Sequence, residues 1–64
     1  MKEIINYVRE KRKSMRIPRK ELAERIGVSQ VTLFNIEHGK GLSSLETFFN
    51  ICDALGLEVT LREK

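Results

Sequence analysis

Hydrophobic residues recur every three or four positions along most of the chain, the spacing that places them on one face of an α-helix. In the first segment, residues 3–15, they are Ile4, Ile5, Val8 and Met15. The same periodicity is found at residues 19–26, 30–38 and 45–55. The pattern predicts four short amphipathic helices.

Residues that favour turns separate these segments. Pro18 disfavours helical backbone for the residue before it and suits the first turn of a following helix. Gly27 and Gly39 follow the second and third segments, where a left-handed residue commonly ends a helix. Ser29 is placed to cap the third helix, because its hydroxyl can accept a hydrogen bond from an amide of the first turn. The segments are therefore predicted to be separate helices joined by short turns.

The fourth segment carries more apolar residues than one helix face needs. They are Leu45, Phe48, Phe49, Ile51, Cys52 and Leu55. Part of this helix is thus expected to contact another surface. Two neighbouring serines could begin it: Ser43 has capping-box spacing to Glu46, and Ser44 is equally suitable.

Beyond Gly56 the apolar period shortens to two residues, which is typical of a β-strand. Apolar and polar residues alternate here and predict one strand over residues 57–62. A lone strand cannot pair its own backbone groups, and no other segment of the sequence has this alternation. The strand is expected to pair with the same strand of a second copy. The expected dimer interface consists of Ile51, Leu55, Leu57, Val59 and Leu61.

The link between the second and third helices has the spacing of a helix-turn-helix. Ala23 falls where the two helices would approach most closely, and Gly27 makes the turn between them. The angle between the helices would be filled by Leu22, Ile26, Val28, Leu33 and Ile36.

These residues also carry a family resemblance. The stretches Glu21-Leu22-Ala23-Glu24-Arg25-Ile26-Gly27-Val28-Ser29, Ile36-Glu37-His38-Gly39 and Ser44-Leu45-Glu46-Thr47 resemble the Cro/phage-repressor class of helix-turn-helix proteins, the XRE family. The resemblance covers about residues 4–56 and implies an all-α, lambda-repressor-like bundle of four to five helices, here one domain over residues 1–64. It also implies that helix 30–38 docks into the DNA major groove, usually from a symmetric dimer.

The resemblance carries two further expectations. Arg12 and Glu37 stand at positions where it implies a partly buried salt bridge, the alternative being two unrelated surface charges. At position 19 the family usually has a glutamine that bridges to the DNA backbone, whereas this chain has Arg19, and Pro18 replaces the usual polar cap. The arginine is expected to increase the electrostatic share of DNA affinity.

The third helix is expected to present its outer side to bases. Leu33 and Ile36 point one way, so the opposite side faces outward. The N-terminal part of a docked recognition helix meets base edges, which makes Gln30, Val31, Thr32, Phe34 and Asn35 the candidate base-reading residues. Glutamine and asparagine can pair with adenine, and the apolar groups can contact thymine methyls. The alternatives are an ordinary polar surface and, for Phe34, a contact with another protein or a neighbouring helix end.

The charge distribution favours an anionic partner. Residues 1–40 contain ten Lys and Arg against five Asp and Glu, and residues 41–64 contain two against four. Nucleic acid is the commonest partner of such a segment, and a solvated basic face is the alternative. The candidate phosphate contacts are Arg16, Arg19, Lys20, Ser29, His38 and Lys40, while Arg9, Lys11 and Lys13 are expected to be solvated.

Composition limits the other possibilities. Sixty-four residues, 41% hydrophobic and 33% charged, suit one small domain that folds in water and does not span a membrane. His38 and Cys52 are the only histidine and cysteine and lie in different segments, so no metal site or catalytic set is expected. We expect no enzyme activity, cofactor or small-molecule substrate. No apolar run of signal-peptide length follows Met1, so the expected location is the cytoplasm.

The sequence leaves two functions open. The first is a sequence-specific transcriptional regulator that binds double-stranded DNA, a dimeric repressor of a palindromic operator. The second follows from residues 55–61, which resemble the end of HipB-type antitoxins. In that subgroup a terminal strand pairs across the dimer, and the protein represses its own operon and binds a toxin. The alternative is therefore an antitoxin-like or bridging protein whose main task is to bind a partner protein such as a toxin.

Overall fold

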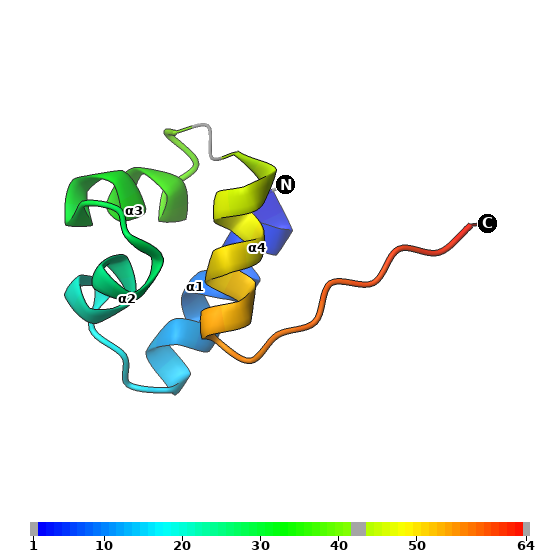
Figure 1. Cartoon of the computed structure of the whole chain (residues 1–64), viewed down its shortest axis with the longest axis horizontal. Helices are drawn as coiled ribbons and strands as arrows, with labels where there is room; N and C mark the ends of the chain where they lie inside the picture. The colour runs from blue at the N-terminus through cyan, green and yellow to red at the C-terminus, as the bar shows by residue number, and fades with distance from the viewer. Residues whose placement is uncertain (1, 42–43, 64) are drawn as a thin grey trace.

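Four helices make up the regular structure of residues 2–41 and 44–63, the parts of the chain that the computed structural model describes. They are α1 (Lys2–Ser14), α2 (Arg19–Ile26), α3 (Gln30–Glu37) and α4 (Leu45–Ala54). Helix α2 packs against both α3 and α4, and α1 packs against α3 (Figure 1). The all-α prediction is confirmed, with four helices in the described residues.

One apolar cluster lies between the helices. Its buried members are Val8, Ile17, Leu22, Ala23, Leu33, Ile36, Ile51, Cys52 and Leu55. The predicted filling of the angle between α2 and α3 is present, because Ile26 and Val28 are partly buried against this cluster. Burying a large aliphatic side chain is worth about 1.5–3 kcal/mol, so this cluster is the main source of stability.

The helix ends follow the predicted caps closely. The Ser29 hydroxyl accepts a hydrogen bond from the Thr32 amide at 3.0 Å, and the Ser44 hydroxyl accepts one from the Thr47 amide at 3.1 Å. Ser44 is thus the N-cap of α4, while the alternative, Ser43, lies outside the described residues. Gly27 ends α2 in the left-handed conformation, with φ of 76°. Helices α1, α3 and α4 each end one residue before the predicted boundary.

The turn that follows α1 contains an arginine in the left-handed conformation. Arg16 has φ of 57°, a value that favours glycine. The Arg16 amide bonds to the Lys13 carbonyl at 2.9 Å, and the Ile17 amide bonds to the Arg12 carbonyl at 3.2 Å. This pair of bonds is the Schellman arrangement that ends many helices. It turns the chain back so that Ile17 enters the core.

The C-terminal segment differs from the prediction. Residues 57–63 form no β-strand. Leu57 packs against the core, and the chain beyond it runs outward from the helices to the C-terminus (Figure 1). A strand requires a neighbour for its amides and carbonyls, and no other described segment of this single chain supplies one. Val59 and Leu61 are exposed in consequence.

Two residues of the expected dimer interface belong to the core instead. Ile51 and Leu55 are 1% and 2% exposed, so their side chains are not available to a second copy. The expectation was wrong for these two because the surplus apolar surface of α4 lies elsewhere on the helix. Leu45 and Phe49 are its exposed apolar residues.

Candidate nucleic-acid interface

Helices α2 and α3 form a helix-turn-helix in which α3 is anchored along one side. Leu33 and Ile36 lie in the core, while the Gly27 and Ser29 caps fix the turn that precedes α3. Ala23 is 1% exposed at the contact between the helices, where a larger side chain would push them apart. The buried side of α3 therefore sets the direction in which its other side faces.

The outer side of α3 carries all five candidate base-reading residues. Gln30, Val31, Thr32 and Phe34 are exposed, and Asn35 is half-buried. Val31 is 70% exposed and Phe34 is 39% exposed, so apolar side chains stand beside the polar ones on this side of the helix. This side mixes amide, hydroxyl and apolar groups, the set that can contact base edges and thymine methyls in a major groove.

The Ser29 hydroxyl makes its hydrogen bonds within the turn. Besides accepting from the Thr32 amide, its hydroxyl donates to Thr32 Oγ1 at 2.9 Å. A serine hydroxyl has one proton to donate, so this contact uses the donor that the expected phosphate contact requires. Ser29 acts here as a cap that shapes the start of α3.

Glu37, the last residue of α3, holds the helix to α1. Its carboxylate accepts two hydrogen bonds from Arg12, from Nε at 2.6 Å and from Nη2 at 3.1 Å. Arg12 Nη1 also donates to the Ile17 carbonyl at 2.9 Å. Arg12 is 6% exposed and Glu37 is 2% exposed, so the pair is present as expected and is buried rather than partly buried. Two parallel hydrogen bonds of this kind fix the orientation of both side chains and add to the attraction between their charges.

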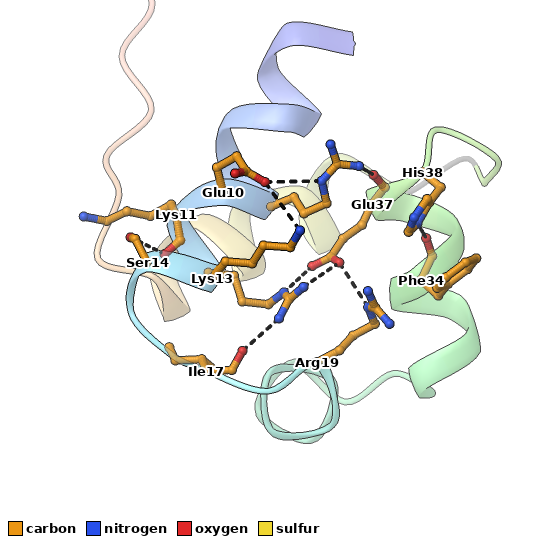
Figure 2. A network of polar contacts seen from close by, with 11 residues as sticks. Glu10, Lys11, Lys13, Ser14, Ile17, Arg19, Phe34, Glu37 and His38 are labelled. Carbon is orange, nitrogen blue, oxygen red and sulfur yellow. Dashed lines mark hydrogen bonds and ion pairs between the residues drawn. The ribbon is translucent and has the colours of Figure 1, made fainter.

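Two further arginines converge on Glu37, as Figure 2 shows for Arg19. Arg19 Nε lies 3.1 Å from Glu37 Oε1, which links the start of α2 to the end of α3. Arg9 Nη1 donates to the Glu37 backbone carbonyl at 3.1 Å, and Arg9 Nη2 donates to Asn6 Oδ1 at 2.9 Å. A cation at a helix C-terminus also interacts favourably with the helix dipole. The expectation that Arg9 is solvated was wrong, because its guanidinium reaches the end of α3.

Phe34 contacts two cationic or aromatic neighbours. The His38 ring stacks on it with centroids 4.0 Å apart and an angle of 21° between the planes. The Arg19 guanidinium carbon lies 5.0 Å from the centroid of the Phe34 ring, within the range of a cation–π interaction. His38 Nδ1 lies 2.8 Å from the Phe34 carbonyl oxygen, which fixes the histidine ring in turn (Figure 2). A contact worth about 0.5–1 kcal/mol at an exposed site is small, but it restricts the orientation of Phe34.

The remaining basic candidates lie at the surface. Arg16, Lys20, His38 and Lys40 are all exposed. Arg16 is in the turn after α1, Lys20 in the first turn of α2, and His38 and Lys40 directly after α3. They lie near the ends of α2 and α3, where the phosphate groups of a docked duplex would approach.

Sequence reasoning missed the two additional arginines on Glu37. A usable signal was present for Arg9, since it lies three residues before Arg12 and so shares its side of α1. The sequence gives no comparable signal for Arg19, because the family resemblance places position 19 against DNA and not against Glu37. The structure therefore identifies Arg19 as part of an intramolecular network.

Across residues 2–41 and 44–63, no group of three or more His, Cys, Asp or Glu side chains could hold a metal ion. None of the described helices is long and apolar enough to cross a membrane. Cys52 is buried in the core, and burial raises the pKa of its thiol above the ordinary value of 9.0.

Comparison with known proteins identifies several relatives. Antitoxin HipB of Escherichia coli O6:H1 (strain CFT073) is 46% identical over 41 residues, which cover 64% of this chain and 44% of the antitoxin. Antitoxin HipB of Escherichia coli strain K12 is 44% identical over 41 residues, covering 64% of this chain and 47% of the antitoxin. The chain thus spans about half the length of these two relatives.

A third relative covers more of both chains. It is an uncharacterized HTH-type transcriptional regulator of Methanothermobacter thermautotrophicus, 41% identical over 51 residues, which are 80% of this chain and 74% of the regulator. A family model described as Helix-turn-helix (HTH_3) matches residues 8–61. The resemblance to the XRE class is thereby confirmed, and the chain belongs to the helix-turn-helix family.

Proposed function

We propose that the protein is a sequence-specific DNA-binding transcriptional regulator that inserts α3 into the major groove. The observation that carries the proposal is the outer side of α3, where five residues able to contact bases stand on a helix fixed from behind by Glu37 and the core. Relatives that include a transcriptional regulator support it. Arg16, Lys20, His38 and Lys40 would contact phosphates on either side of the groove.

We propose further that two copies act together as a repressor of a palindromic operator. Leu57, Val59 and Leu61 alternate along an extended segment whose apolar side chains lack a full covering in the single chain. Pairing this segment with its copy would satisfy the backbone groups and cover that surface. Recognition helices on adjacent half-sites would then lie about 34–36 Å apart, one turn of DNA.

The DNA-binding proposal is tested by selection from a random duplex pool at a stated salt concentration, followed by titration of the selected duplex and a random one. Gln30→Ala is expected to weaken binding to the selected duplex by about 1–3 kcal/mol and to leave the random duplex unaffected. Asn50→Ala removes a similar amide from the exposed surface of α4 and serves as the matched control. Equal losses on both duplexes for Gln30→Ala would contradict base reading by α3.

The dimer proposal has its own measurement. Leu61 is 91% exposed in the single chain, so Leu61→Asp leaves the helical core untouched. It places a charge in the proposed ribbon and is expected to shift the protein from dimer to monomer in sedimentation equilibrium. A change of Arg62 to Asp, on the other side of the same segment, is the control. A wild-type protein that sediments as a monomer at binding concentrations would refute the dimer and leave base reading intact.

A second candidate function is binding of a partner protein such as a toxin. An apolar groove of about 370 Å³ lies between α1, α4 and the C-terminal segment, and it is lined in part by Ile4, Tyr7, Phe48 and Val59. Two relatives named as antitoxins favour this function. If the protein shifts no fragment from its own upstream region but co-purifies with the product of a neighbouring gene, partner binding becomes the main function.

A further inference from the structure

Arg19 is held between the interior and the exposed side of α3. Its Nε is 3.1 Å from the buried carboxylate of Glu37, while its guanidinium carbon is 5.0 Å from the ring centroid of Phe34. Both partners belong to α3, one turn apart, whereas Arg19 is the first residue of α2. Figure 2 shows the side chain directed toward Glu37, with Phe34 beside it. One guanidinium thus joins a buried anion to an exposed aromatic ring.

We propose that Arg19 is a positioning residue for base reading, which holds Phe34 in one orientation, and that it is not a phosphate ligand. This inference rests on the proposed DNA-binding function. With Gln30, Val31 and Phe34, Arg19 lines a surface hollow of about 270 Å³ on the outer side of α3. Phe34 is one of the four residues that line this hollow, so fixing its ring also fixes the shape offered to a base pair.

The chemistry of arginine suits this role. A guanidinium is planar, so its edge can donate to a carboxylate while its face lies over an aromatic ring. A lysine ammonium carries the same charge but has no flat face and no fixed arrangement of donors. Lysine at position 19 would preserve electrostatic attraction to DNA and lose the coupling between Glu37 and Phe34.

A phosphate contact by Arg19 would conflict with the contacts that are present. The Arg19 side chain is 31% exposed, against 2% for Glu37, so withdrawing it removes one of the two guanidiniums from a buried carboxylate. Lys20, the next residue, is exposed and makes no ion pair or hydrogen bond among the described residues. Lys20 is therefore the phosphate ligand expected at this end of α2, and it provides a matched control.

The test compares Arg19→Lys, Arg19→Ala, Lys20→Ala, Phe34→Leu and the double variant Arg19→Lys/Phe34→Leu on selected and random duplexes over a range of salt concentrations. Arg19→Lys is expected to lower the preference for the selected duplex about tenfold without changing the slope of log K against log salt. Lys20→Ala should weaken both duplexes equally and reduce that slope by about 0.9. Phe34→Leu should match Arg19→Lys, and the double variant should lose little more than either single variant.

The outcomes separate the two roles. If Arg19→Lys binds like wild type while Arg19→Ala weakens both duplexes and lowers the slope by about 0.9, Arg19 is a phosphate ligand and the proposal is overturned. Multiplied losses in the double variant would also overturn it, because residues acting through one contact do not act independently. Far-UV circular dichroism confirms that each variant keeps its helices.

A measurement without DNA makes the inference independent of the proposed function. In the free protein, Arg19→Lys should move the NMR signals of the Phe34 and His38 ring protons, and Lys20→Ala should not. Unchanged ring signals in Arg19→Lys would refute the positioning role whatever the protein binds. A wild-type protein that prefers no duplex would instead refute the proposed function, and the ring signals would still decide whether Arg19 holds Phe34.

Discussion

Glu37→Gln should be among the most damaging single substitutions in this protein. The change keeps the size of the side chain and removes the charge that two guanidiniums share. Arg12, at 6% exposure, would remain buried without its counter-ion. The NH₂ group of the new glutamine would also point its donors at the guanidinium donors. Breaking a buried pair in this way costs about 3–5 kcal/mol.

That cost is large relative to the whole protein. At about 0.05–0.15 kcal/mol per residue, a chain of this length has a free energy of unfolding of about 3–10 kcal/mol. Glu37→Gln would therefore leave the protein marginally folded or unfolded at 25 °C. The assay is urea denaturation followed by far-UV circular dichroism, with the unfolding slope compared between variants so that a change in compactness is detected.

Two matched variants show whether burial is the cause. Glu10 also contacts cations, Arg9 and Lys13 at 3.7 Å, but its side chain is 66% exposed. Glu10→Gln is expected to cost less than about 1 kcal/mol because exposed pairs contribute little. Replacing both charges of the buried pair, Arg12→Met with Glu37→Leu, should restore most of the stability that Glu37→Gln loses. A loss below about 1 kcal/mol for Glu37→Gln itself would refute the view that Arg12 is left uncompensated.

The remaining predictions concern single positions. Gly27→Ala should destabilise the protein by about 1 kcal/mol in urea denaturation, since Gly27 has φ of 76° and alanine is strained there. Arg16→Gly should stabilise it by about 0.5–1 kcal/mol in the same assay, because Arg16 already has φ of 57°, and should weaken binding to all duplexes alike if Arg16 contacts phosphate. Ser44→Ala removes the α4 cap and should cost about 1 kcal/mol. Burial raises the pKa of the Cys52 thiol above 9.0, so the folded state holds this proton more tightly than the unfolded state does. The contribution of Cys52 to the free energy of unfolding should therefore be constant below pH 9.0 and should fall as the pH rises through the raised pKa, which urea denaturation at a series of pH values would detect.

Helix periodicity identified most of the core but failed at the junction between α1 and α2. Met15 fits the apolar spacing of α1, yet it is exposed, because the helix ends at Ser14 and the next residues leave its register. Ile17 was not expected in the core, since it precedes Pro18 and belongs to no helix. It is buried because the left-handed Arg16 reverses the chain, and nothing in a sequence pattern marks an arginine for that conformation.

The C-terminal segment shows a different reason for failure. Leu57, Val59 and Leu61 alternate with polar residues at a period of two, but a period alone does not make a strand. A strand exists only when a neighbour pairs its backbone groups, and within the described residues of one chain that neighbour is absent. The pattern is therefore a sound predictor of a strand only together with a segment that can pair with it.

The candidate site was predicted unevenly for a related reason. The outward side of α3 follows from helix geometry once Leu33 and Ile36 are assigned to the core, so local sequence was sufficient. The partners of Glu37 come from three different segments, and their convergence depends on how α1 and α2 are placed against α3. A count of charges treats Arg19 as one more cation available to DNA. In the fold, Arg19 instead contacts the Glu37 carboxylate and the Phe34 ring. In a domain this small, residues that hold α3 in place and the residues proposed to contact bases share the same few contacts, so on the proposed function Arg19→Lys should alter base preference even though it conserves charge.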